Sequence, residues 1–231
     1  MKTTIVLGLM NSGSGAVHDY LSSRVDFYSP FGTSEFKICA DPMGLDNVYV
    51  NCFENFSFFN PSNSIYEFIK YIEKIQNYIV YETYGKGKKL FKQNLDKSTK
   101  EFIKKITDIS YHGNPEFSNF KISNIESLYL KLIKRRYNFF KVRIPARKEV
   151  FINESKKYIE KIILNNLNKK KINSNSNVVL NQAANIFNPV RSSQYFKNRK
   201  IIIVTRDPRD MFSSMKKRKS KGPPSNDVKI F

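Results

Sequence analysis

The chain has 231 residues, 40% of them hydrophobic and 14% aromatic, which is enough to bury one good core and leaves little room beyond a single domain. A formal charge of +20 invites the hypothesis of a nucleic acid, anionic membrane or acidic glycan partner, but the lysines are scattered and no nucleic-acid recognition motif accompanies them, so we expect no specific nucleic-acid partner. The two cysteines, Cys39 and Cys52, have neither metal-ligand spacing nor the number that a disulfide framework needs, which favours buried thiols in a reducing compartment and predicts no metal site.

The chain begins with MKTTIVLGLMNSGSGAVHDYL, which predicts a strand, a glycine-rich loop and a helix. An apolar run from Thr4 to Leu9 is typical of a buried strand, residues 8–15 hold three glycines and two serines, and a helix is expected to start over 16–21. The apolar stretch is short and leads directly into the loop, so we expect no signal peptide. No segment has the uninterrupted apolar length of a transmembrane helix, and we expect a cytoplasmic protein.

This loop has the arrangement of a phosphate-binding turn but contains no lysine. Successive backbone N–H groups and the positive end of a helix dipole can hold an anionic oxygen cluster without a charged side chain. The usual nucleoside-triphosphate loop is G-x-x-x-x-G-K-[ST]; here Gly8 and Gly13 occupy the glycine places, while Ser14 and Gly15 replace Lys-Ser/Thr. The pattern therefore predicts an anion site and leaves open which anion it binds.

The middle of the chain has mainly helical spacing. A second short strand that ends in a turn is expected over residues 32–45. Helices are expected at 62–79, 88–109, 123–137 and 149–167, with a turn at 110–119, a strand at 139–145 and a structureless polar segment at 169–177. Two further strands follow, one from residue 176 and a clearer one within 197–210, and Pro208 opens a last helix. Strands of Ile and Val that alternate with helices favour an α/β fold with a parallel sheet covered on both faces.

The segment KIIIVTRDPRDMFSS, residues 200–214, predicts a second anion site. Arg206 stands where an apolar strand ends and Pro208 starts a helix, and Ser213 or Ser214 lies about two turns later on the side that can return toward the arginine. The simpler alternative is a surface ion pair of Arg206 and Asp207 with Arg209. We expect residues 4–9 and 200–205 to be parallel strands of one sheet, with Gly13 and Arg206 opening onto the same crevice.

The two ends of the chain together resemble the PAPS-dependent sulfotransferases, whose donor is 3'-phosphoadenosine 5'-phosphosulfate. NSGSGA, comprising Asn11, Ser12, Gly13, Ser14, Gly15 and Ala16, is similar to the family loop that cradles the 5'-phosphosulfate. Arg206 to Asp210 and Ser214 match the family motif R-[DN]-P-[RK]-D-x-x-x-S, which holds the 3'-phosphate. Many family members carry a lysine or arginine where Asn11 stands. Sulfonyl transfer uses no magnesium-bound γ-phosphate, so the resemblance accounts for a phosphate loop without its lysine.

The resemblance implies an α/β, P-loop-type three-layer fold with a central parallel sheet and helical insertions. Residues 1–231 then form a single sulfotransferase-like domain, with a helical insertion at about 60–170 and the C-terminal part of the family fold missing. The implied activity moves a sulfonyl group from PAPS to a hydroxyl or amine, with PAP as product and a cell-surface glycan as the acceptor. The segment at about 60–175 carries almost none of the resemblance and would form the acceptor pocket.

A sulfonyl transfer also requires a base that takes the acceptor proton. The place of the histidine in the cytosolic class is occupied by Asn181-Gln182-Ala183, and amides can orient an acceptor but cannot accept its proton. In the glycan-sulfating class the base is a glutamate that begins the second strand, and its counterpart here is Glu35. Two nearby anions would raise the pKa of that carboxyl, which suits a base. The other candidate is His18, four residues after Ser14; for both, an ordinary packing or surface role is the alternative.

Two other functions compete with this prediction. A P-loop kinase would need a Walker lysine and a magnesium-holding aspartate, of which the first is missing and the second unassigned. A nucleotide-binding or polyanion-binding protein without catalysis needs neither a base nor the rest of the family fold. Differential stabilisation by PAP, ATP and a polyanion would separate the three.

Overall fold

A computed structural model of the chain describes residues 1–80, 88–92, 94–113, 140–167 and 176–217. Its centre is a four-stranded sheet with the order β2-β7-β1-β8, in which every pairing is parallel. The strands are β1 (Lys2–Gly8), β2 (Phe27–Tyr28), β7 (Asn177–Asn181) and β8 (Arg199–Val204). Side chains of β1 and β7 are buried on both sheet faces, which explains why these strands are apolar runs without alternation.

The pairing register brings three chain segments to one edge of the sheet. Val6 of β1 lies opposite Asn181 of β7, and Gly8 lies opposite Val204 of β8. The expectation that the first and last strands are parallel strands of one sheet is therefore confirmed, and the two strands are direct neighbours. Because carboxyl ends of parallel strands share an edge, the segments that follow β1, β7 and β8 all emerge together there.

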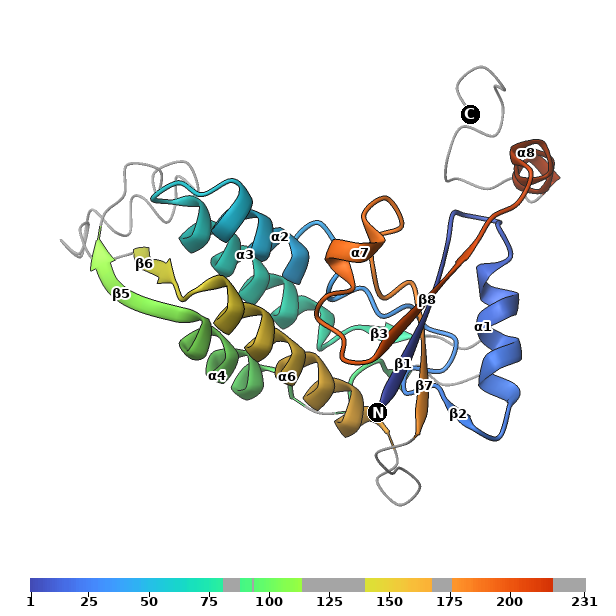
Figure 1. The fold of residues 1–231 in the computed structure, drawn as a ribbon, viewed down its shortest axis with the longest axis horizontal. Coiled ribbons are helices and arrows are strands. Elements are labelled where there is room, and N and C mark those ends of the chain that lie inside the picture. The colour runs from blue at the N-terminus through green and yellow to red at the C-terminus, as the bar shows by residue number, and fades with distance from the viewer. Residues whose placement is uncertain (81–87, 93, 114–139, 168–175, 218–231) are drawn as a thin grey trace.

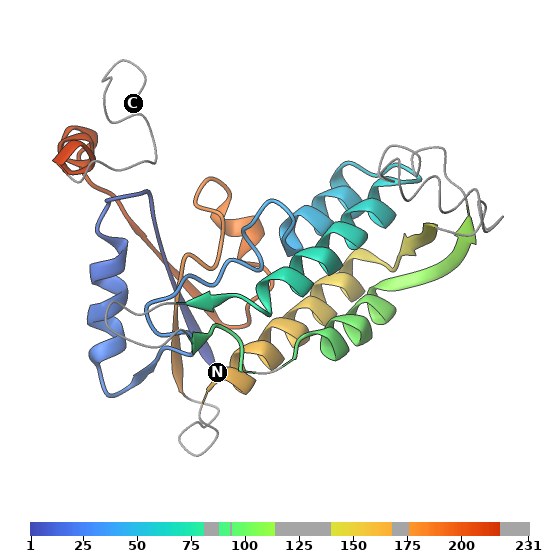
Figure 2. The ribbon, with the colours of Figure 1, turned by 180° about the vertical axis from the view of Figure 1, so that it is seen from behind.

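Helices cover both faces of this sheet, as Figures 1 and 2 show. Helix α1 (Ser14–Ser23) lies on one face. The other face carries α2 (Leu45–Tyr49), the π-helical turn η1 (Val50–Glu54), α3 (Asn60–Ile75), α4 (Asp96–Ile106), α6 (Lys148–Asn166) and α7 (Pro189–Ser192). Helix α8 (Pro208–Lys217) follows β8 beyond the sheet edge. This mixed α/β arrangement is compatible with a three-layer fold.

One cluster of buried side chains joins the sheet to the helical layer. Ile5 and Leu7 of β1 belong to the same cluster as side chains from α3, α4 and α6. Phe102 of α4 stacks on Tyr158 of α6 with ring centroids 4.6 Å apart, and Thr99 shares a hydrogen bond of 2.8 Å with the Tyr158 hydroxyl. The helical layer therefore packs against the sheet as one continuous core.

The strand expected over residues 32–45 is wrong except at its start. Glu35 forms one isolated parallel bridge with Asn181, and the Phe36 N–H donates to the Asn181 carbonyl at 2.9 Å. The chain then turns, because the N–H groups of Ala40 and Asp41 both donate to the Lys37 carbonyl. After this turn the chain enters α2.

The helix expected at 88–109 and the turn expected at 110–119 are also partly wrong. The helix covers only Asp96–Ile106, and β4 (Lys88–Lys89) pairs antiparallel with β3 (Ile79–Val80). Strand β5 (Thr107–Gly113) instead pairs antiparallel with β6 (Phe140–Pro145) at the far end of the helical layer. The strand expected at 139–145 and the helices expected at 62–79 and 149–167 are confirmed, although α3 ends at Ile75. The helix expected at 123–137 and most of segment 169–177 lie outside the described residues.

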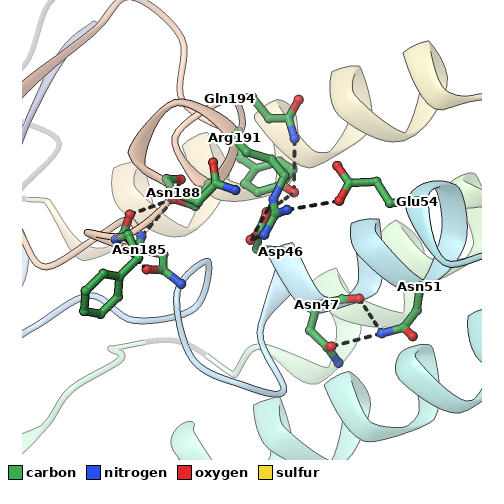
Figure 3. Close-up of polar contacts among 11 residues, drawn as sticks. Asp46, Asn47, Asn51, Glu54, Asn185, Asn188, Arg191 and Gln194 are labelled. Atoms are coloured by element: carbon green, nitrogen blue, oxygen red, sulfur yellow. Dashed lines mark hydrogen bonds and ion pairs between the residues drawn. The ribbon is translucent and has the colours of Figure 1, made fainter.

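A partly buried ion pair joins α2 to α7, the helix that follows β7 (Figure 3). Asp46 of α2 is only 6% exposed and binds the Arg191 guanidinium through both oxygens, with a shortest distance of 2.9 Å. The Tyr195 hydroxyl donates to the same carboxylate at 3.1 Å, and Arg191 also reaches Glu54 at 3.0 Å. No sequence pattern indicated this network, which holds the segment after β7 in place.

Candidate anion-binding site

The loop after β1 folds as the glycines predict. The N–H of Ser12 donates to the Leu9 carbonyl at 3.0 Å, and both Asn11 (φ 61°) and Gly13 (φ 94°) adopt the left-handed conformation. Gly13 is the N-cap of α1, and within the described residues no side chain caps this helix start. The first N–H groups of a helix have no intrahelical acceptor, and Gly15 is exposed there. The loop therefore presents backbone donors and the positive helix end to the surface.

The buried hydroxyl of Ser12 gives an independent sign of a ligand. Ser12 is 6% exposed, and its Oγ has no hydrogen-bond partner among the residues that the structure describes. A buried hydroxyl normally has a partner, because leaving it without one costs about 1 to 3 kcal/mol. A β-carbon on Gly8 would overlap both this oxygen and the Ser14 side chain, so only glycine allows the loop this close. An anionic oxygen at the loop could accept a hydrogen bond from the Ser12 hydroxyl.

Gln182, directly after β7, determines the shape of this loop. Its Nε2 donates to the Gly8 carbonyl at 2.8 Å and to Ser14 Oγ at 3.2 Å, and its Oε1 accepts the Gly8 N–H at 3.4 Å. Gln182 itself has a φ of 52°, which is uncommon for a residue with a β-carbon. The sequence suggested that this amide could orient an acceptor; in the structure it holds the anion loop. Its place after a buried strand was the only available signal.

Arg206 lies at the rim of the same loop. Its Nη1 donates to the Asn11 carbonyl at 3.4 Å, and its Nε lies 3.9 Å from Asp210 Oδ2. The guanidinium is 42% exposed, so most of its donors remain available to a ligand. The two sequence motifs, 195 residues apart, thus come together at one place.

Arg209 and Arg206 have different partners in the structure. Arg209 pairs with Asp207 at 2.6 Å, and this exposed pair raises the pKa of Arg209 and lowers that of Asp207. The surface ion pair offered as an alternative therefore forms, but Arg206 is not part of it. Ser214 lies on α8, eight residues after Arg206, and is partly buried.

Glu35 reaches the same sheet edge but its carboxylate binds a lysine. Its backbone pairs with Asn181, which pairs with Val6, so Glu35 lies two strand spacings, about 10 Å, from β1. The carboxylate lies 2.6 Å from Lys37 Nζ, and this hydrogen bond raises the pKa of Lys37. Glu35 also lines a cavity of about 360 Å³.

His18 is buried beneath α1. It is 1% exposed, its Nδ1 lies 3.3 Å from Asp19 Oδ1, and its Nε2 lies 3.4 Å from Ser29 Oγ. These two contacts occupy both ring nitrogens. The sequence pattern did not distinguish a histidine that faces the loop from one that packs under the helix.

The arrangement can bind an anion at one sheet edge without a metal ion. Among the described residues, no group of three or more His, Cys, Asp or Glu side chains could hold a metal. No helix among the described residues is long and apolar enough to cross a membrane.

No family model matches the sequence, and comparisons with curated proteins and with solved structures found no match.

Proposed function

We propose that the protein is a PAPS-dependent sulfotransferase of the P-loop type. The observation that carries the proposal is the contact between Arg206 and the Asn11 carbonyl, which places the second motif at the rim of the first. Two adjacent anion sites suit a ligand with charged groups at both ends of one nucleoside. PAPS is such a ligand, whereas ATP has no 3'-phosphate.

Each of the two motifs binds one end of the PAPS molecule in this proposal. The N–H groups at the start of α1 and the Ser12 hydroxyl bind the 5'-phosphosulfate, while Arg206 and Ser214 bind the 3'-phosphate. Asn11 stands where many family members have a cation, and its carbonyl accepts a hydrogen bond from Arg206. The acceptor is a hydroxyl or amine, with a cell-surface glycan as the class that the resemblance implies.

Glu35 is the base in this proposal. It is exposed at the sheet edge where the anion loop emerges, whereas the ring nitrogens of His18 are occupied and buried. For proton transfer the carboxylate must leave Lys37 and reach the acceptor. Glu35→Gln keeps the side-chain shape and removes the basic oxygen, so turnover should fall by roughly 100-fold or more while PAP affinity stays nearly unchanged.

Direct binding measurements test the donor assignment. Isothermal titration of the full chain with PAP, adenosine 5'-phosphate and ATP at one salt concentration should give the tightest binding for PAP, because only PAP occupies both sites. Equal affinity for ATP and PAP would refute the sulfotransferase proposal and favour a P-loop kinase or a general anion binder.

A second function is favoured by one observation. Lys37 holds the Glu35 carboxylate, and His18 is buried, so neither candidate base is free in this structure. A nucleotide-binding protein without catalysis would bind PAP as predicted but transfer no radiolabelled sulfonyl group from PAPS to a panel of glycans and amines. If the unmodified chain does not bind PAP, both proposed functions are wrong.

A further inference from the structure

The cavity beside Glu35 has the composition of a small-molecule site. It measures about 360 Å³, within the range of ligand pockets, and is formed by the 34–41 segment, α3 and the residues that flank β3 and β4. The lining residues are Ser34, Glu35, Lys37, Ile38, Asp41, Tyr71, Ile75, Tyr78, Leu90 and Phe91. The residues of the anion loop and Arg206 are not among them.

The charge of the cavity is opposite to that of the whole chain. Two carboxylates, Glu35 and Asp41, face one ammonium, Lys37, in a chain of net charge +20. Lys37 is paired with Glu35 at 2.6 Å and Asp41 also raises the pKa of Lys37, so the three groups together leave one net negative charge. An anionic ligand would meet this net negative charge, whereas a cation would neutralise it.

Asp41 is held in place with one oxygen available. The Tyr71 hydroxyl donates to Asp41 Oδ2 at 2.7 Å, and no other side-chain donor among the described residues bonds this carboxylate. Tyr71 is 7% exposed, so the hydrogen bond fixes the carboxylate from the core side. Oδ1 can then accept from a ligand without rearrangement of the wall.

The remaining wall is apolar and aromatic. Ile75, Leu90 and Phe91 provide hydrocarbon surface, and Tyr71 and Tyr78 add two phenol rings. Such rings also attract a cation that lies over their faces. A ligand that satisfies both parts of the wall has an apolar ring and a positively charged donor.

We propose that this cavity binds a small primary amine with an aromatic or alicyclic body, whose ammonium group donates to Asp41. The body of the amine packs on Ile75, Leu90 and Phe91. This inference uses neither the anion loop nor Arg206, but it shares Glu35, the proposed base, with the sulfotransferase proposal.

A series of three ligands that differ in charge tests the proposal. Isothermal titration with 2-phenylethylamine, 2-phenylethanol and 3-phenylpropionate keeps the ring and changes the polar group from cation to neutral to anion. The amine should bind at least tenfold more tightly than the alcohol, and the carboxylate should bind weakest. The amine affinity should also fall as salt is raised, whereas the alcohol affinity should change little.

Matched variants locate the site. Asp41→Asn should weaken amine binding by tenfold or more and leave alcohol binding nearly unchanged, whereas Glu73→Gln removes an equal charge from an exposed position on α3 and should have little effect. Tyr71→Phe keeps the carboxylate and should retain amine selectivity. If Asp41→Asn fails to fold, the ligand series and salt dependence on the unmodified chain still decide. Equal binding of amine and alcohol, or equal losses in Asp41→Asn and Glu73→Gln, would overturn the proposal.

Discussion

Gln182 hydrogen-bonds both backbone groups of Gly8 across neighbouring strands, donating to the carbonyl at 2.8 Å and accepting from the N–H at 3.4 Å. The same Nε2 reaches Ser14 Oγ at 3.2 Å. One amide thus fixes the start of the anion loop and the first residue of α1. Because an amide both donates and accepts, neither a carboxylate nor a hydrocarbon of the same size can replace it.

The first prediction is that Gln182→Glu weakens both the fold and the binding of an anion. A carboxylate would face the Gly8 carbonyl without a proton to donate, which should lower the free energy of unfolding by about 1 to 3 kcal/mol. The displaced loop should bind PAP at least tenfold more weakly under conditions where the protein is still folded. Titration calorimetry and urea unfolding measure the two effects. A loss of stability with unchanged PAP affinity would show that Gln182 has only a structural role.

The second prediction compares two glycines of the same loop. Gly8→Ala should lower the free energy of unfolding by about 1 to 3 kcal/mol, because the new methyl group overlaps the Ser12 and Ser14 side chains. Gly15→Ala should change stability by less than about 0.5 kcal/mol, since nothing lies within 4 Å of its added carbon. Chemical denaturation of both variants gives the comparison. Equal effects would mean that the close approach at Gly8 is not what the loop requires.

The third prediction concerns the ion pair between Arg191 and Asp46. Arg191→Met leaves a carboxylate that is 6% exposed with the Tyr195 hydroxyl and no cation, so unfolding should become easier by about 2 to 4 kcal/mol. Lys197→Met removes a lysine from the more exposed pair with Glu160 and should cost less than about 1 kcal/mol. Urea unfolding at neutral pH measures both. Comparable losses would indicate that the buried geometry adds nothing.

The fourth prediction follows from burial of the two thiols. Burial raises the pKa of Cys52 to about 12 and raises that of Cys39 well above its ordinary range. At pH 8, Ellman's reagent should therefore label the native chain far more slowly than the urea-unfolded chain. The raised pKa favours the folded state below the ordinary thiol pKa of about 8.5, and this contribution is lost as the pH rises toward 12. Rapid labelling of two thiols in the native chain would contradict the burial.

The strands and long helices were predictable because their signals are local. Runs of Ile and Val mark β7 and β8, and the helical spacing of Ile65, Phe68 and Ile72 marks α3. Strand β5 was missed because its partner β6 lies some 30 residues away, and helix propensity alone favoured a longer α4. Helix α2 was missed for a similar reason, since Asp46 binds an arginine 145 residues further along the chain.

The candidate site divides in the same way. The glycines of the loop and the arginine after β8 could be predicted from the sequence, because local sequence determines both a glycine turn and the end of an apolar strand. The hydrogen bonds of Gln182 and the pairing of Glu35 with Lys37 depend on which strands and side chains become neighbours. Residue types at strand ends therefore indicated where a site lies, but not which groups bind the ligand and which hold the loop.

The last prediction tests whether Arg206 binds the 3'-phosphate of PAP. Arg206→Ala should weaken PAP binding by about 2 kcal/mol, roughly 30-fold, because a charge-assisted contact is lost, while the affinity for adenosine 5'-phosphate should change less than threefold. Arg209→Ala removes an equal charge three residues away, but that guanidinium is already paired with Asp207, so PAP affinity should change less than threefold. Titrations of both variants at the same ionic strength cancel the general effect of net charge. If the two variants weaken PAP equally, Arg206 contributes only to the overall positive field, and the second motif is not a 3'-phosphate site.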